Sequence, residues 1–317
     1  MSQKTINEAF FHVFRRIRDE HMFTSTPSTA SAEYHDNPEI KAAISKCIEF
    51  NLIVNRERPN NDEAFLFLSG LRGIVEDLIV LKYSLRFSPS ARLVYFGILQ
   101  RLNLDQGILA QKKFFKSNNP FQAVVGSNIS MEESQNRLDN VKLKLKDFWQ
   151  EQGCSKKNGP SIKEMSEAVN LMSTYQYIYF AASNFVHFNP HALLRTGWGP
   201  EGGPFTFSIQ NFSGYYRDLA AFYGAVLYVG FATTFGPLLS LESEFKNEIS
   251  DIESILIDAP RWPELITFEE LNLSAPQLSA EEKAIKEKIL GIKHEGGEKF
   301  VLIDILNEIK GTMIDNS

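Results

Sequence analysis

The stretch LAAFYGAVLYVGFATTFGPLLSL, residues 219–241, decides the fold, because its 23 residues carry no charge. That length satisfies the criterion for a membrane-spanning helix. The flanks argue against a span: Arg217 and Asp218 precede the stretch, acidic residues follow it, and no basic cluster sets an orientation. Its three glycines also suit a helix that neighbours pack closely. We therefore predict a buried core helix, with a membrane-associated protein as the alternative.

The rest of the chain repeats a helical pattern. Apolar residues recur at spacings of three and four, while alternation at a spacing of two is almost absent. This periodicity predicts an all-α multi-helix bundle. The expected helices cover residues 5–22, 38–56, 62–87, 90–116, 131–151, 161–187, 213–247, 280–291 and 298–311, with one short strand within 204–212. Composition divides the chain into N-terminal helices (1–60), a core helical domain (61–258) and a small C-terminal helical appendage (259–317).

Composition limits the classes of function. A chain of 317 residues that is 43% hydrophobic can bury a substantial core, and its net charge of −6 gives no general attraction to phosphate backbones. Cys47 and Cys154 are far apart and lack CxxC spacing, which predicts free thiols in a reducing cytoplasm. The N-terminus has the pattern of an amphipathic helix and not of a secretory signal. His187 and His191 have the spacing of a metal-binding pair, but Pro190 between them prevents the helical geometry that such a pair needs. Motifs for phosphate loops and acyl transfer are absent, so we expect no metal and no cofactor.

A polar stripe crosses one of the most apolar segments, LFLSGLRGIVEDLIVLKYSL, residues 66–85. Apolar side chains occur on nearly every side of this helix, as is typical of a buried helix. Helical spacing nevertheless aligns five of its residues on one face: Ser69, Arg72, Gly73, Glu76 and Tyr83. Arg72 and Glu76 are spaced for an ion pair. Because buried charge needs further hydrogen bonds, the stripe predicts polar partners elsewhere.

The expected partners lie near the end of a second apolar helix, in SNFVHFNP, residues 183–190. Helical spacing puts four residues on one face: Tyr177, Phe180, Asn184 and His187. We expect Pro190 to end the helix and the helix dipole to favour protonated His187. The candidate site has Arg72, Glu76 and His187 as catalytic residues and Asn184, Asn189 and Arg195 as substrate-binding residues, the last as a lid. The alternative is a polar network that only fixes helix register.

Three segments carry a resemblance to a known group: RGIVEDLIVLKY (72–83), YFAASNFVHFNPHALLRTGWG (179–199) and RWPELITFEELN (261–272). Together they resemble a family of uncharacterised, mostly bacterial helical proteins that is similar in outline to the HEPN superfamily. Many HEPN members are ribonucleases of toxin–antitoxin or antiphage systems. The resemblance implies attack by an RNA 2′-hydroxyl, with an arginine stabilising phosphate charge and a histidine moving a proton.

The superfamily's signature, an arginine followed four to six residues later by histidine, occurs only at Arg15 or Arg16 with His21. Activity would therefore require Arg72 and His187 to converge from different helices. We expect a cytoplasmic protein with RNA or a nucleotide as its partner. Whether it is an enzyme stays open. The alternative is a non-catalytic interaction or scaffold protein that binds another protein or forms a homo-oligomer.

Overall fold

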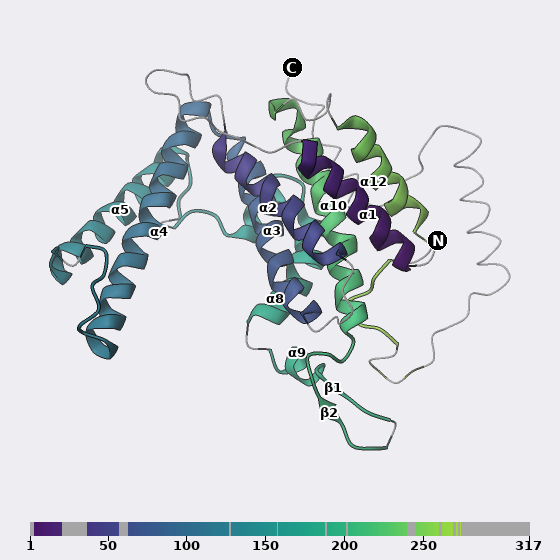
Figure 1. Ribbon diagram of the computed structural model, residues 1–317. Helices are drawn as coiled ribbons and strands as arrows, with labels where there is room; N and C mark the ends of the chain where they lie inside the picture. Colours follow the sequence, from purple (N-terminus) through teal and green to yellow (C-terminus); the bar gives the residue numbers. More distant parts are fainter. Residues whose placement is uncertain are drawn as a thin grey trace. The chain divides into compact units, whose positions relative to one another are not determined.

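The computed structural model is helical, as the sequence predicts, and a two-stranded ribbon is the one sheet among the residues that it describes. The described residues are 3–20, 37–56, 63–126, 128–156, 158–187, 189–200, 202–239, 245–259, 262–268, 271 and 273. The helices predicted at 280–291 and 298–311, and His21, lie outside them. Figure 1 shows the order of the elements along the chain.

Contacts group the chain into two compact units. Unit 1 consists of Met1–Val80 and Ser166–Ser317, and unit 2 of Leu81–Met165. The three-part division drawn from composition, with boundaries near residues 60 and 258, stays a prediction beside this grouping. The candidate site lies in unit 1, because every residue predicted for it belongs there.

Unit 1 is built around α10 (Ser213–Leu239), which contains most of the uncharged stretch. It packs on α2 (Pro38–Asn55) and α12 (Lys246–Asp258), while α1 (Gln3–Glu20) contacts all three helices (Figure 1). By length and composition α10 could cross a membrane, yet 89% of its most apolar window is buried inside the protein. The stretch thus has the position of a core helix. The predicted helix 213–247 is too long, since α10 ends at Leu239.

A close helix contact fixes α10 against α2. The buried side chain of Asn51 donates from Nδ2 to the carbonyl oxygens of Cys47 (2.9 Å) and Gly224 (3.0 Å). A Cβ atom at Gly224 would lie 2.7 Å from Asn51 Oδ1. Glycine at this position therefore lets the two backbones approach closely enough for the side chain of one helix to bond the backbone of the other.

The predicted helix 161–187 is broken in the structure. Its first part, α6 (Ile162–Ala168), starts with a capping box, in which the backbone N–H of Ser161 donates to Glu164 and that of Glu164 to the Ser161 hydroxyl. It ends where Asn170 takes φ 54° and Leu171 N donates to Ser166 O (2.7 Å). This left-handed residue is a helix C-cap. The chain resumes with α7 (Met172–Thr174), the π-helix η1 (Tyr175–Tyr179) and α8 (Phe180–Val186).

The strand predicted within 204–212 is confirmed, and its partner is the glycine-rich segment before it. β2 (Thr206–Phe207) pairs antiparallel with β1 (Gly197–Trp198). Short α9 (Pro190–Leu194) precedes the ribbon and begins at Pro190. Proline is common at the first position of a helix, where its missing N–H costs nothing, although it is strongly unfavourable in the interior.

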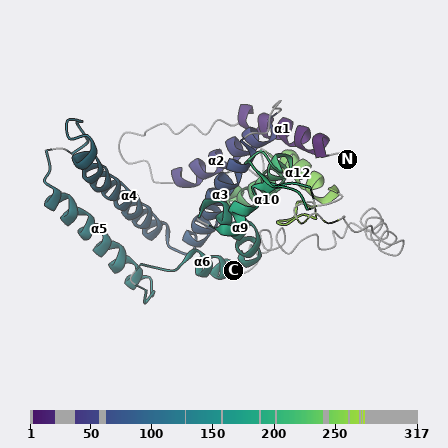
Figure 2. The ribbon, with the colours of Figure 1, turned by 90° about the horizontal axis from the view of Figure 1, so that it is seen from below.

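Unit 2 is a helical hairpin of α4 (Pro89–Asn118) and α5 (Met131–Glu151), which run side by side in both views (Figures 1 and 2). Ser88 and Ser130 cap the two helices with their hydroxyls. At one end of the hairpin, aromatic rings pack edge to face: Phe87, Tyr95, Phe148 and Trp149. Burial raises the pKa of Tyr95 to about 12.

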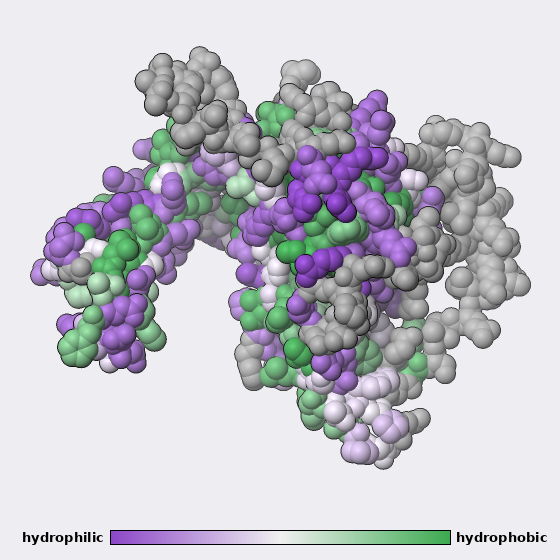
Figure 3. All heavy atoms as spheres, in the orientation of Figure 1, coloured by the Kyte–Doolittle hydropathy of each residue, from purple (hydrophilic) through white to green (hydrophobic). Residues whose placement is uncertain are grey.

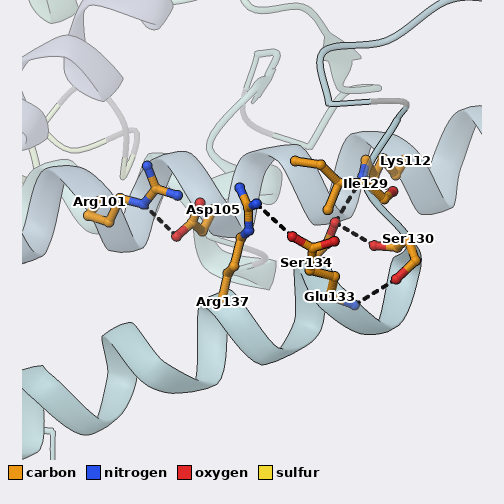
Figure 4. A network of polar contacts seen from close by, with 8 residues as sticks. All are labelled: Arg101, Asp105, Lys112, Ile129, Ser130, Glu133, Ser134 and Arg137. Carbon is orange, nitrogen blue, oxygen red and sulfur yellow. Dashed lines mark hydrogen bonds and ion pairs between the residues drawn. The ribbon is translucent and has the colours of Figure 1, made fainter.

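Polar contacts join α4 to the start of α5 and to the loop before it, and ion pairs lie within each of the two helices (Figure 4). Buried Lys112 donates from Nζ to Ile129 O (2.7 Å) and to the hydroxyl of Ser134 (2.9 Å). Arg101 pairs with Asp105 within α4, and Arg137 with Glu133 within α5, each at 2.7 Å. The surface that α4 turns toward α5 is therefore partly polar, with buried Lys112 bound to uncharged oxygens.

Candidate functional site

Arg72 and Glu76 lie on α3 (Ala64–Ser84), whose other faces are buried in unit 1. Their ion pair, Nη1 to Oε2 at 3.2 Å, is at the edge of the core, because the two side chains are 23% and 35% exposed. The polar stripe is thus partly hydrated and does not run through the interior. Partial exposure reduces the desolvation cost that a fully buried pair would carry.

The remaining contacts of Arg72 come from η1 and α8. Its Nη2 donates to Tyr179 Oη (3.0 Å), and its Nε lies 3.3 Å from Ser183 Oγ. The guanidinium carbon is 5.2 Å from the centre of the Tyr179 ring, and Tyr175 stacks on that ring from one turn away. Glu76 on α3 and two residues of the continuous stretch formed by η1 and α8 therefore orient the same guanidinium group.

The π-helix η1 ends at Tyr179, one of the two residues that reach Arg72. A π turn contains an extra residue relative to an α turn, so it shifts the faces of the helix, and such turns are frequent at functional sites. The side chains facing Arg72 are Tyr179 and Ser183, whereas the predicted face carried Tyr177 and Asn184. Tyr177 instead points to the opposite side and packs against Tyr223 of α10. The predicted face was wrong because spacing along one helix does not fix how that helix is rotated toward α3.

His187 ends α8 one turn after Ser183. Its backbone N–H donates to Ser183 O (3.1 Å), its φ and ψ of −97° and 156° are extended, and its side chain is exposed. A helix rises 1.5 Å per residue, so the backbones at 183 and 187 are about 6 Å apart along the axis. The imidazole is thus attached one turn from the group that holds Arg72.

Asn184 and Asn189 lie together at the corner between α8 and α9. Asn189 Nδ2 donates to Asn184 Oδ1 (2.8 Å), and Asn189 Oδ1 accepts from the backbone N–H of Ala192 (3.4 Å), in the manner of a helix cap. These two amides hold the turn that follows His187. They belong to the same local region as Arg72, and these two hydrogen bonds join them to each other and to α9.

Arg195 holds a different part of the chain. It is 9% exposed, its guanidinium lies 5.4 Å from the Phe185 ring centre, and its Nη2 donates to Leu265 O (2.6 Å). Residues 262–268 are also bound by two tyrosines, because the hydroxyls of Tyr177 (3.2 Å) and Tyr223 (2.8 Å) both donate to Pro263 O. Burial raises the pKa of both hydroxyls, which keeps them protonated as donors.

The three segments that carried the sequence resemblance therefore meet in unit 1: α3 contacts η1 and α8, and the other side of η1 contacts residues 262–268. Sequence reasoning did not identify Tyr179 or Ser183. The three tyrosines and one phenylalanine within 175–180 were a usable signal, since large aromatics so close together cannot all face one side of an α-helix. Among the described residues, no group of three His, Cys, Asp or Glu side chains is arranged to hold a metal ion.

Comparison with known proteins gives a family without an assigned function. The sequence model of DUF5677, a family of unknown function, matches residues 41–203. The matched span includes α3, unit 2, η1, α8 and the candidate site residues Arg72 to Arg195. Residues 262–268 lie beyond it. No curated protein and no solved structure matches the chain.

Proposed function

The chain belongs to the DUF5677 family, and we propose that it is a HEPN-like protein that binds the phosphate of RNA or of a nucleotide at Arg72. In the fuller form of the proposal it cleaves RNA with His187, as a cytoplasmic component of a bacterial toxin or antiphage system. The observation that carries the proposal is the Arg72 guanidinium, which is partly exposed and is oriented by Tyr179 and Ser183. Exposed His187 follows Ser183 by one helical turn.

The ion pair with Glu76 is weak enough for a phosphate to replace it. A partly exposed i, i+4 pair contributes about 0.3–0.5 kcal/mol. A hydrogen bond to a charged group contributes about 1.5–3 kcal/mol, and a guanidinium presents two parallel donors to a phosphate. Tyr179 and Ser183 would keep the guanidinium in place during this exchange, because they bind Nη2 and Nε and leave Nη1 to the incoming anion.

Cleavage would use His187 for proton transfer. Neutral His187 takes the proton of the 2′-hydroxyl, the 2′-oxygen forms a bond to phosphorus, and the bond from phosphorus to the 5′-oxygen breaks. The 5′-oxygen then takes a proton, which the imidazolium can return. Arg72 stabilises the charge that builds on the phosphate oxygens. The products are a 2′,3′-cyclic phosphate and a 5′-hydroxyl, with no co-reactant.

A competition experiment tests the binding step. Fluorescence anisotropy with a labelled single-stranded RNA should show weaker binding for Arg72→Gln and tighter binding for Glu76→Gln, since the second change removes the carboxylate that competes with phosphate. Arg217→Gln is a matched control, because this arginine binds the carbonyl oxygens of Val54 and Arg56 elsewhere in unit 1. Absence of RNA binding by the wild-type protein, or equal binding by all four proteins, refutes the proposal.

The cleavage step has a separate test. His187→Gln should abolish release of cyclic-phosphate products while RNA affinity and melting temperature stay unchanged, because the side chain is exposed. His12→Gln, at an exposed histidine on α1, is the control. If wild-type protein binds RNA but yields no products, the protein is a binding component and the catalytic form of the proposal is excluded.

One observation favours a second function. All three nitrogens of the Arg72 guanidinium already have protein partners: Glu76, Tyr179 and Ser183. A network of this kind suits a non-catalytic interaction protein in which Arg72 fixes η1 against α3 and another region binds the partner. Under this alternative, Arg72→Gln and Glu76→Gln both lower the melting temperature and neither alters RNA binding.

A further inference from the structure

We propose that the end of the α4–α5 hairpin that carries its connecting loop binds single-stranded nucleic acid, with lysines on the phosphates and phenylalanine rings stacked on the bases. This loop end consists of residues 113–126, and the side chains that bind are those of Lys113, Phe114, Lys116 and Phe121. The site goes beyond the phosphate site proposed at Arg72, because it lies in unit 2 and binds a strand whether or not Arg72 does.

Unit 2 is basic although the whole chain is acidic. Residues 81–165 contain 14 Lys and Arg against 7 Asp and Glu, a formal net charge of +7, whereas the rest of the chain has 19 against 32, or −13. No acidic residue occurs within 106–131, so the loop end lies in the most basic part of unit 2. The net charge of −6 conceals this separation. A polyanion is therefore attracted to unit 2 and not to the chain as a whole.

The lysines of the loop end are not neutralised within the hairpin. Lys113 and Lys116 are exposed and form no ion pair with any described residue. Residues three apart on a helix are neighbours on its surface, so the two ammonium groups present adjacent contacts to a chain of phosphates. Buried Lys112 has another role, because it anchors the loop through Ile129 O. The ion pairs of unit 2 engage four other cations: Arg101, Arg137, Lys142 and Lys156.

The loop presents Phe121 outward at the apex of a tight turn. Gln122 N donates to Asn119 O (3.1 Å), which leaves Pro120 and Phe121 at the two central positions. Proline favours the first of these positions, and the side chains of Asn119 and Gln122 close the turn with a second hydrogen bond (3.1 Å). Asn119 N donates to Phe115 O (2.8 Å), which joins the turn to the end of α4. The ring of Phe121 is thus held in place and is 97% exposed.

Exposed rings beside unpaired lysines favour a single strand of nucleic acid as the ligand. Proteins bind such strands with cations that follow the backbone and aromatic rings that stack on the bases. Phe114, directly after Lys113, is 61% exposed and supplies a second ring. Figure 3 shows apolar residues at the surface of the α4–α5 hairpin among polar ones.

The basic charge also extends away from the loop end. Lys144 and Lys146 lie on α5 more than a dozen residues after its start at Met131, which is about 20 Å along the helix. Neither forms an ion pair with a described residue. Cations spread along a hairpin suit a chain of phosphates, whereas a membrane surface would contact only those at the loop end.

The electrostatic part is tested by fluorescence anisotropy of the full chain with a labelled, unstructured oligouridylate at several salt concentrations. The logarithm of the affinity should fall by roughly 0.7 for each phosphate contact per decade of salt. Lys113→Gln and Lys116→Gln should each weaken binding and reduce this slope. Lys246→Gln, at an exposed lysine of α12 in unit 1, is the matched control and should change neither.

The stacking part is tested at Phe121. Phe121→Ala should weaken binding roughly 5- to 150-fold, as the loss of one stacked base does. Phe121→Trp should bind like the wild type, whereas Phe121→Leu should be as weak as the alanine variant, because leucine is apolar but has no ring. The melting temperature should stay unchanged, since the side chain is almost fully exposed. Phe205→Ala, at an exposed phenylalanine of unit 1, is the matched control.

Three outcomes overturn the proposal. One is an absence of oligouridylate binding, or binding that the lysine and phenylalanine variants of the loop end leave unchanged. Another is Phe121→Leu binding as tightly as the wild type, which shows an apolar contact without stacking. The third is binding to vesicles of phosphatidylcholine and phosphatidylserine in place of the oligonucleotide, which assigns the loop end to a membrane surface.

The same titrations separate this site from the one at Arg72. If only Arg72→Gln weakens RNA binding, the loop end is not a binding site and the function proposed for unit 1 stands. If only the variants of the loop end weaken binding, the reverse holds.

Discussion

Replacing Gly224 by alanine is expected to destabilise unit 1, although alanine is the better helix former. The added Cβ would lie 2.7 Å from Asn51 Oδ1 and 3.0 Å from the Phe50 ring. Contacts between a real Cβ and its neighbours are longer than this, so α2 and α10 must separate or Asn51 must rotate. Either movement breaks the hydrogen bond from Asn51 Nδ2 to the carbonyl of residue 224.

The magnitude follows from three opposing effects. Alanine in place of glycine stabilises a helix interior by about 1 kcal/mol. Overpacking a core contact costs about 1–3 kcal/mol. A buried N–H that loses its acceptor costs about 1–3 kcal/mol more, and Asn51 is fully buried, so water does not replace the lost acceptor. The net loss is about 1–5 kcal/mol. A loss of about 3 kcal/mol corresponds to a fall in melting temperature of roughly 6–12 °C for a unit of this size.

The assay is thermal unfolding followed by circular dichroism, with urea unfolding as a check. Gly214→Ala is the matched control, because the same substitution in the first turn of α10 meets nothing within 4 Å. It should leave the melting temperature unchanged or raise it slightly. The reasoning is refuted if Gly224→Ala is as stable as the wild type, or if both alanine variants change stability in the same direction.

Three other predictions concern titration, reactivity and docking. Burial raises the pKa of Asp218, so the protonated carboxyl is favoured in the folded state. The stability that this protonation contributes is complete below the unfolded pKa of about 4 and is lost as pH rises through the pKa of the folded state. Asp218→Asn should therefore raise the free energy of unfolding at neutral pH and lose that advantage near pH 3; a gain independent of pH contradicts this. Iodoacetamide should modify Cys154 in the folded protein and Cys47 only after unfolding, because Cys47 is fully buried and burial raises the pKa of its thiol; mass spectrometry separates the two. Arg195→Ala should speed limited proteolysis within 262–268, and an unchanged rate would exclude the clamping role of the arginine.

The sequence predicted the helical class and the burial of residues 219–241 for physical reasons that the structure bears out. An uncharged run of more than 20 residues has few structural alternatives to burial. In the structure α10 is buried by α1, α2 and α12. The pairing of Arg72 with Glu76 could also be predicted from the sequence, since i, i+4 spacing depends on local helix geometry alone.

The partners of Arg72 could not be predicted from the sequence in the same way. Assigning them required the rotation of the helix around residues 175–183 relative to α3, which brings Tyr179 and Ser183 to Arg72 and turns Tyr177 toward Tyr223. Periodicity gives the spacing of residues on one helix, so it can neither fix that rotation nor locate the π-helix η1. The break at Asn170 was missed for a related reason: asparagine tolerates a left-handed backbone but does not require it.

The glycines inside the long helices differ in whether a close contact within the chain offsets their cost in helix stability. Each glycine in a helix interior costs about 1 kcal/mol relative to alanine. At Gly224 the structure contains the compensation, because Asn51 occupies the space that a side chain would need. At Gly97 and Gly107 the same cost has no counterpart among the described residues. Gly214, which also has open space, lies in a first turn, where helix propensity matters less. A mid-helix glycine with nothing beside it therefore has no compensation among the described residues for its cost in helix propensity.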